Sequence, residues 1–81
     1  APEFFYFYDK KQTLSEILEL DSRAEVMRRS KDAERAADLL GKSFQSRLKG
    51  LYERLGIKVP KRYSKLSVPS DDAPMGSSEE E

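Results

Sequence analysis

The sequence of 81 residues contains no cysteine and no histidine. Without cysteine the chain can form neither a disulfide framework nor a thiolate metal site, which fits an intracellular protein. Without histidine it lacks the usual general base near neutral pH and the commonest metal ligand. No residue pair offers a nucleophile beside a base, and no glycine-rich phosphate loop is present. We therefore expect a protein that is not an enzyme and that needs no cofactor and no metal.

Apolar residues are also scarce, at 37% of the chain, against about 45–50% in ordinary globular proteins. No apolar run approaches the roughly 20 residues that a membrane span needs, so we expect no membrane partner. A domain this small buries only about 60% of the surface of its unfolded chain. The missing core is expected to come from another protein chain or from a second copy.

The net charge of zero hides three blocks of different sign. Residues 1–41 hold seven basic and nine acidic residues, which gives a net charge of −2. Residues 42–65 hold eight basic residues against Glu53 alone, a net charge of +7, and residues 66–81 hold five acidic residues and no basic one, a net charge of −5. These blocks indicate a basic segment followed by an acidic tail.

One stretch, residues 30–56, carries the only sustained helical pattern. Its apolar residues recur every three or four positions and so form one stripe along a helix. They are Ala33, Ala37, Leu40, Phe44, Leu48, Leu51 and Leu55. Val26 shares the phase of this stripe, which predicts one long helix over about 22–55 with a kink near Ser30. Gly56 with Ile57 is expected to end it, and Pro60 forbids its continuation.

A shorter helix is expected before the long one. Thr13 and Glu16 match a capping box, which predicts a helix start at Thr13, and Asp21–Ser22 offers a new N-cap. The predicted fold class is therefore all-α, a long amphipathic helix preceded by a shorter helix. The helical interaction module covers 13–57, a basic extended linker covers 58–68, and a disordered acidic tail covers 69–81.

The aromatic N-terminal segment, residues 1–12, contains the run Phe4 to Tyr8. Aromatic residues favour strands, so this run is predicted to be extended. Its rings either cap the helical core or dock onto a partner's sheet or groove through Phe5 and Phe7.

Small residues lie beside the stripe at Ala36, Ser43 and Gly50, spaced by seven. They predict a shallow groove that another helix can approach closely. Residues 14–20 are too short to cover it alone, so a helix from another chain or a second copy is the alternative occupant. The expected partner-binding residues here are Ala36, Leu40, Ser43, Phe44, Arg47, Gly50 and Leu51.

The basic block supports a second hypothesis, a nucleic-acid-binding module that uses residues 42–65. Lysine and arginine contact phosphates, and a tyrosine can stack on an unpaired base. The candidate residues for nucleic acid or an acidic partner are Lys49, Arg54, Lys58, Lys61, Arg62 and Tyr63. The run 58–65 also resembles a nuclear-import patch, which would place the chain in the nucleus. Alternatively, the acidic tail folds back on this block and competes with an acidic ligand.

Residues 36–41, followed by Leu48, Leu51, Leu55 and Gly56, resemble the terminal helix-turn-helix of Fis-type DNA-binding proteins over about twenty residues. That resemblance implies a turn at Gly41. The sequence departs from the family pattern, because the interval after Gly41 is one residue longer and Lys42 replaces an aliphatic residue. Since the stripe keeps its phase through Gly41, a continuous helix is favoured. The function we expect is a non-enzymatic helical module for protein interaction or oligomerisation, part of a larger assembly.

Overall fold

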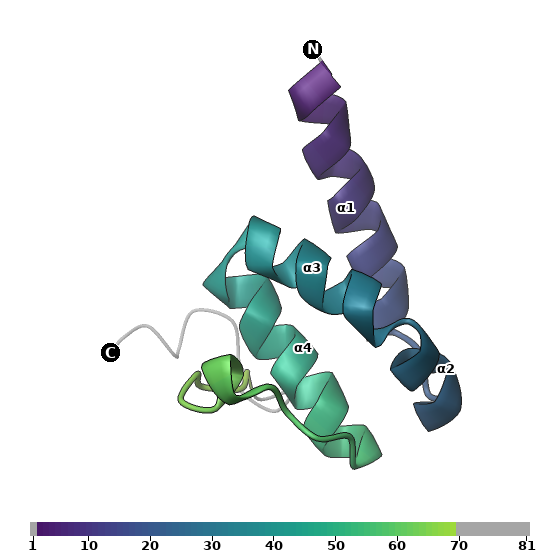
Figure 1. Cartoon of the computed structure of the whole chain (residues 1–81), viewed down its shortest axis with the longest axis vertical. Helices are drawn as coiled ribbons and strands as arrows, with labels where there is room; N and C mark the ends of the chain where they lie inside the picture. Colours follow the sequence, from purple (N-terminus) through teal and green to yellow (C-terminus); the bar gives the residue numbers. More distant parts are fainter. Residues whose placement is uncertain (1, 70–81) are drawn as a thin grey trace.

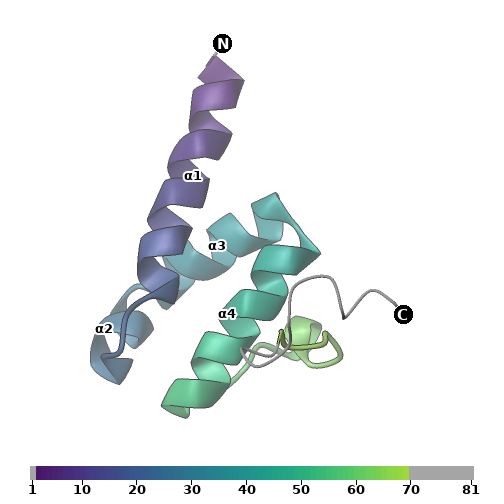
Figure 2. The same cartoon turned by 180° about the vertical axis from the view of Figure 1, so that it is seen from behind.

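The computed structural model describes residues 2–69, with side chains from Phe5 onward, and this part of the chain is helical without any strand. Its elements are α1 (Pro2–Leu18), α2 (Arg23–Arg28), α3 (Ser30–Leu40), α4 (Lys42–Leu55) and the 3₁₀-helix η1 (Lys61–Tyr63). Figures 1 and 2 show α3 and α4 meeting at an angle, α1 crossing α3, and the chain after α4 returning along α4. The all-α prediction is confirmed, whereas the predicted disordered tail at 69–81 lies, beyond Pro69, outside the described residues.

The aromatic run is helical, so the prediction of an extended N-terminal segment is wrong. Helix α1 begins at Pro2, and Thr13, the expected helix start, lies in its interior. Proline is well suited to a first helical position. A lone strand would leave its backbone amides and carbonyls without partners, whereas a helix pairs them internally. This backbone requirement outweighs the weak strand preference of the aromatic side chains.

Two of the predicted helix boundaries are confirmed. Ser22 is the N-cap of α2, and its hydroxyl accepts a hydrogen bond from the backbone N–H of Glu25 at 3.2 Å. The kink expected near Ser30 is a full break at Arg29, where the Ser30 hydroxyl donates to the carbonyl of Met27.

The long helix predicted over 22–55 does not exist, because a second break falls at Gly41. Gly41 has φ 116° and ψ −178°, a conformation that only glycine adopts readily. The carbonyl of Ala37 accepts the N–H of Gly41 at 3.0 Å and also the side-chain amide of Gln45 at 3.2 Å, which ties α4 to the end of α3. Only one residue leaves the helical geometry, so the phase of the stripe is preserved although the helix axis changes direction.

The core lies where α1, α3 and α4 meet. Three alanines on α3 let its neighbours approach closely. The buried residues are Leu14, Ile17, Val26, Ala33, Ala36, Ala37, Leu48, Leu51, Tyr52, Ile57 and Tyr63. The stripe therefore forms the inner side of the angle between α3 and α4, as an apolar face should.

The end of α4 follows the prediction. Gly56 adopts the left-handed conformation at φ 71°. The N–H of Ile57 donates to the carbonyl of Tyr52 at 2.8 Å, and the N–H of Gly56 donates to that of Glu53 at 3.3 Å. This pair of bonds is a Schellman motif, and the buried side chain of Ile57 completes it.

Residues 57–69 form what we call the C-terminal arm, which packs back on α3 and α4. The expectation of an extended linker over 58–68 is therefore wrong in part, because this region contains η1 and buries the ring of Tyr63. Partly buried Val59 and Leu66 pack against the core from the same segment. Residues 58–68 are rich in charge, and this packing explains why they also contain apolar residues.

Candidate interaction surfaces

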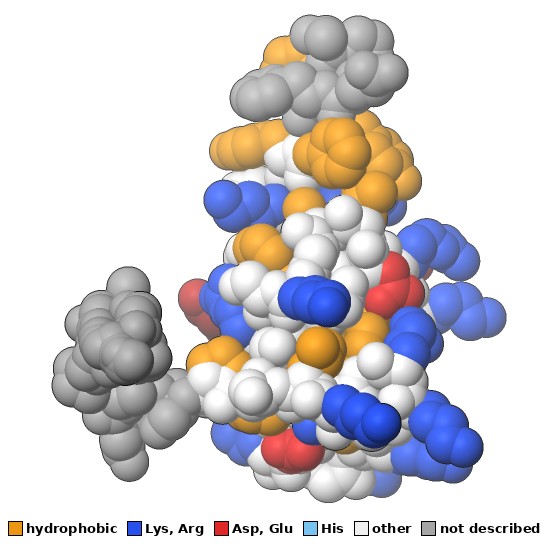
Figure 3. Space-filling view, turned by 90° about the vertical axis from the view of Figure 1, so that its left-hand side faces the viewer, with side chains coloured by type: hydrophobic (Ala, Val, Ile, Leu, Met, Phe, Trp, Pro, Cys, Tyr) orange, Lys and Arg blue, Asp and Glu red, His pale blue; other side chains and the backbone are white. Residues whose placement is uncertain are grey.

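The first surface is the aromatic end of α1, which we define as residues 5–8. Figures 1 and 2 show this half of α1 standing clear of the other helices. The side chains of Phe5, Tyr6, Phe7 and Tyr8 are 60%, 50%, 45% and 52% exposed. Figure 3 shows hydrophobic side chains gathered toward this end of the molecule. The aromatic end thus presents a run of large rings to solvent.

A notch lies beside the aromatic end. Phe7, Tyr8 and Lys11 of α1 and Leu40 at the end of α3 enclose about 270 Å³. Phe7 lies seven residues before the buried Leu14, so both occupy one face of the helix. The face that α1 buries in the core therefore continues beyond the body of the protein. At the notch, no described residue covers this face of α1 completely.

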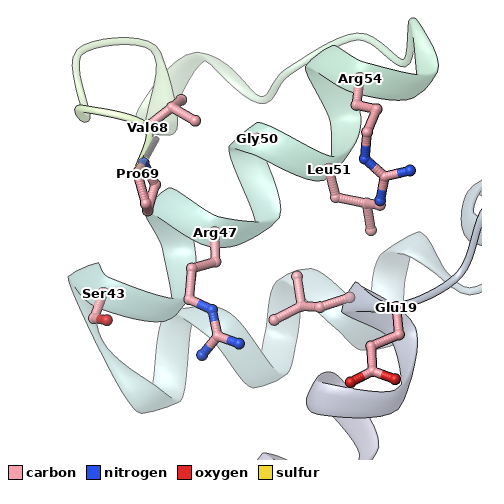
Figure 4. Close-up of a pocket in the computed structure, with 9 residues that line it drawn as sticks. Glu19, Ser43, Arg47, Gly50, Leu51, Arg54, Val68 and Pro69 are labelled. Atoms are coloured by element: carbon pink, nitrogen blue, oxygen red, sulfur yellow. The ribbon is translucent and has the colours of Figure 1, made fainter. Parts of the chain in front are cut away.

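The second surface, the α4 groove, lies between the end of α1, one face of α4 and the C-terminal arm. It has a volume of about 800 Å³. Its lining residues are Leu18, Glu19, Ser43, Arg47, Gly50, Leu51, Arg54, Val68 and Pro69. Figure 4 shows Val68 and Pro69 on one side and Glu19 on the other, with the Arg47 side chain between them.

Gly50 explains how the arm can form a wall of this groove. A Cβ atom at this position would come within 2.9 Å of Cγ1 of Val68. The small residue therefore permits a close approach, as the sequence predicted. The approaching segment, however, includes the arm of the same chain.

A cluster of polar side chains, which we call the tyrosine latch, holds the arm on α3. It consists of Glu34, Asp38, Tyr52, Arg62 and Tyr63. The hydroxyl of Tyr52 donates to Glu34 at 2.7 Å, and Arg62 donates to Asp38 at 2.8 Å. The hydroxyl of Tyr63 donates to Asp38, and the Arg62 guanidinium lies 4.7 Å from the Tyr63 ring centre. The latch therefore uses both charge and hydrogen bonds.

Four groups of the latch have pKa values that are shifted by burial and by their hydrogen bonds. Burial and the hydrogen bond to Glu34 raise the pKa of Tyr52, and burial with the bond to Asp38 raises the pKa of Tyr63. Burial opposes ionisation of Asp38, but its bonds from Arg62 and Tyr63 outweigh burial and lower its pKa. The bond to Asp38 raises the pKa of Arg62. Each group is thus held in its ordinary charge state, whereas a general acid or base needs a pKa near the working pH.

Lys49 provides a second anchor for the arm. Its side chain is buried, and its ammonium donates to the carbonyls of Ser64 at 2.7 Å and Leu66 at 2.8 Å. A buried charge is tolerated when its hydrogen bonds are satisfied. Lys49 therefore satisfies two backbone carbonyls of the arm and ties the arm to α4.

The structure distributes the predicted partner-binding residues over both surfaces and the core. Phe5 and Phe7 belong to the aromatic end, and Leu40 lines the notch. Ser43, Arg47, Gly50 and Leu51 line the α4 groove. Phe44 is half-buried, and the Arg47 guanidinium lies over its ring, 5.1 Å from the ring centre. Ala36 lies apart from this groove, buried on α3.

Of the residues predicted to bind nucleic acid, four make contacts within the fold. Lys49, Arg62 and Tyr63 anchor the arm, and the buried ring of Tyr63 has no face open for stacking. Arg54 pairs with Asp21 at 3.1 Å. Lys58 and Lys61 are exposed, and neither forms an ion pair with a described residue.

Sequence patterns missed several residues of these surfaces. Leu18, Glu19, Val68 and Pro69 line the groove, and Glu34, Asp38 and Tyr52 belong to the latch. The signal that could have revealed the arm is the spacing of Val59, Tyr63 and Leu66 by four and three, which places apolar groups on one side of a helical turn.

Two further kinds of site are not found among residues 2–69. No described helix has both the length and the apolar character needed to cross a bilayer. The acidic side chains in this part of the chain form no cluster of three or more that could hold a metal ion.

No protein-family model, curated protein sequence or solved structure matches the chain. The helices do meet at Gly41, as the resemblance to Fis-type proteins implies, but a single residue joins them in place of a turn of three to four residues.

Proposed function

We propose that this chain is a non-enzymatic helical module for protein interaction or oligomerisation, and that it docks through the aromatic end of α1. The observation that carries the proposal is the exposure of four consecutive rings, each 45–60% open to solvent. Successive residues of a helix are about 100° apart, so these rings point to all sides of α1. A helix that is hydrophobic all round is normally buried.

The exposed area is of the size that a binding site needs. A fully buried aromatic side chain covers roughly 150–250 Å², so four half-exposed rings leave about 300–500 Å² open. The largest apolar patch on a monomer is typically about 300–600 Å² and is often functional. Two copies that joined through these rings would bury at most roughly 600–1,000 Å², close to the lower limit of about 1,000 Å² for a specific interface.

The notch adds shape to this surface. It gives an incoming apolar side chain contacts with Phe7 and Tyr8 from one helix and Leu40 from another. Buried pockets lined by aromatic residues are where binding energy concentrates in protein interfaces. The nucleic-acid alternative has no comparable support, because Lys49, Arg62 and Tyr63 hold the arm in place.

Sedimentation equilibrium of the full chain, over a wide concentration range, tests self-association through this surface. Phe7→Gln/Tyr8→Gln should shift the equilibrium toward the monomer, because it removes two rings and keeps a good helix former at both positions. The control is Met27→Gln, since Met27 on α2 is 46% exposed and lies outside both surfaces. Circular dichroism should show the same helix content for all three chains.

A different partner is tested by placing a photo-crosslinking side chain at Tyr6. We expect one discrete crosslinked species that disappears with Phe7→Gln/Tyr8→Gln and is absent when the same group is placed at Met27. A monomer at all concentrations that also gives the same crosslinks from both positions would overturn the proposal.

A further inference from the structure

The α4 groove holds an arginine, Arg47, that no carboxylate among residues 5–69 pairs with. Among the described residues, no acidic side chain forms an ion pair with Arg47, whose guanidinium stacks on Phe44 at 5.1 Å. Arg54, at the other end of the groove, donates to Asp21 at 3.1 Å. One cation of the groove is therefore already matched, and Arg47 is available to an acidic ligand.

The floor of the groove beside Arg47 is apolar. It is formed by Leu18 of α1 and by Gly50 and Leu51 of α4, where Gly50 faces the arm. Figure 4 shows the Arg47 side chain extending toward the end of α1, across the open part of the groove. A ligand that matches this surface carries a carboxylate next to a short apolar segment.

The chain itself continues from the wall of this groove. Pro69 lines the groove, and the next residues are Ser70, Asp71 and Asp72, followed by Ala73–Pro74–Met75. Each residue spans at most about 3.3–3.6 Å, so Asp71 and Asp72 lie roughly 7–11 Å along the chain from Pro69. A carboxylate pair followed by three apolar residues is the pattern that the groove requires.

We propose that residues 70–81 occupy the α4 groove, with the Asp71–Asp72 pair on the Arg47 guanidinium and Ala73–Met75 over the floor formed by Leu18, Gly50 and Leu51. Charge-assisted bonds between arginine and carboxylate are among the stronger hydrogen bonds in proteins. A short tether raises the effective concentration of the segment to the millimolar range, so weak contacts suffice. The groove then accepts acidic–apolar peptides, and an outside peptide has to displace the chain's own segment. This inference does not depend on the aromatic end, which shares no residue with the groove.

The absence of cysteine makes a direct test simple. A nitroxide on Ser77→Cys labels the full chain at one place only. We expect the amide NMR signals of Ser43, Arg47 and Gly50 to lose intensity, while those of Ala24 and Lys31 keep theirs. At about 1 M NaCl, where the Debye length is about 3 Å, the lost intensity should return in large part.

Charge reversal assigns the contact to its residues. Arg47→Glu should abolish the signal loss at Ser43 and Gly50, and adding Asp71→Arg/Asp72→Arg to that variant should restore it. Arg35→Glu is the matched control, because Arg35 lies on the exposed side of α3 and pairs with Asp32 only at 3.9 Å. If the nitroxide again reduces the Ser43 and Gly50 signals in the double reversal, the absence of this effect in Arg47→Glu alone is not caused by a folding defect.

Two outcomes would overturn the proposal. One is an equal signal loss at Gly50 and Ala24, which would show no preference for the groove. The other comes from a mixture of the nitroxide-labelled chain with a ¹⁵N-enriched copy that carries no nitroxide. If Gly50 of that copy loses as much signal as Gly50 does within one chain, the segment lies in the groove of a second copy. Neither result depends on self-association through α1, because the experiment can be repeated with Phe7→Gln/Tyr8→Gln.

Discussion

Two glycines near the stripe have different roles, although both lie beside its apolar residues. Gly41 has a backbone conformation at φ 116° that side-chain-bearing residues rarely adopt, yet a Cβ atom there would meet nothing within 4 Å. Gly50 is an ordinary helical residue, and its Cβ would meet Val68. The first is needed for its backbone and the second for its lack of volume.

Gly41→Ala is therefore expected to lower the free energy of unfolding by about 1–3 kcal/mol, the usual cost of a side chain in such a conformation. Urea denaturation followed by circular dichroism measures it. Gly50→Ala is the comparison, and its effect should stay below about 1 kcal/mol, because the gain in helix propensity of about 1 kcal/mol offsets the displaced Val68. Equal losses for both variants would contradict this account of Gly41.

At the scale of elements, the C-terminal arm depends on polar contacts with α3 and α4. The tyrosine latch and the Lys49 ammonium together bond residues 62–66 to both helices. Tyr52 and Tyr63 are both buried, and the hydroxyl of each donates a hydrogen bond to a carboxylate of α3. The Tyr63 hydroxyl holds the arm on α3, and the Tyr52 hydroxyl holds α4 on α3. The packing of these three segments should therefore depend on the protonation of both hydroxyls.

This dependence predicts a loss of stability at alkaline pH. The folded chain raises the pKa of Tyr52 and of Tyr63, whereas the unfolded value is about 10. Their contribution is complete below about pH 10 and is lost as the pH rises from there toward the folded pKa, because the unfolded chain releases the protons first. The slope approaches about 1.4 kcal/mol per pH unit for each tyrosine.

Urea denaturation between about pH 8 and 11 tests this window around the ordinary tyrosine pKa. The wild type should lose stability more steeply than Tyr52→Phe/Tyr63→Phe, in which both rings stay in the core but no hydroxyl titrates. The variant is less stable at neutral pH, since Glu34 and Asp38 each lose a hydrogen bond from a tyrosine hydroxyl and, among the described residues, keep only those from Arg62. Parallel pH curves for the two chains would show that the hydroxyls are not the cause.

Local signals predicted the elements that depend on neighbouring residues. The Ser22 cap and the Gly56–Ile57 end of α4 need only a few adjacent residues, and both are as expected. The break at Gly41 was missed because one residue can redirect a helix without shifting the phase of its apolar stripe. A periodicity argument measures that phase and not the direction of the axis.

Contacts between distant segments could not be predicted from such patterns. The latch joins Glu34 to Arg62 across 28 positions of the sequence, and the α4 groove combines the end of α1 with Val68. The basic charges of residues 42–65 suggested a ligand, yet Arg62 and Lys49 bond to the chain itself. Of the expected groove, Ser43 and Gly50 lie together because they share one helix, whereas Ala36 belongs to another.

For the whole molecule, the two surfaces lie at different places and differ in chemistry. The aromatic end presents Phe and Tyr rings with few charges, while the α4 groove combines an apolar floor with Arg47. The formal net charge of the chain is zero, so long-range repulsion between copies is small. Association through the rings would then be limited by apolar area and should resist salt, whereas occupation of the groove should not.

Association of this kind links stability to concentration. If the folded chain self-associates through the aromatic end, a rise in concentration of about 100-fold favours the associated state by about 2.7 kcal/mol per binding event. Shared between two chains, this amounts to roughly 1.4 kcal/mol each, and about 1 kcal/mol shifts the melting temperature of a small domain by about 4–8 °C. We therefore expect the midpoint of thermal unfolding to rise by several degrees.

Calorimetry at two concentrations measures the shift, which Phe7→Gln/Tyr8→Gln should remove and Met27→Gln should preserve. A midpoint that is independent of concentration in the wild type would limit the aromatic end to partners other than itself.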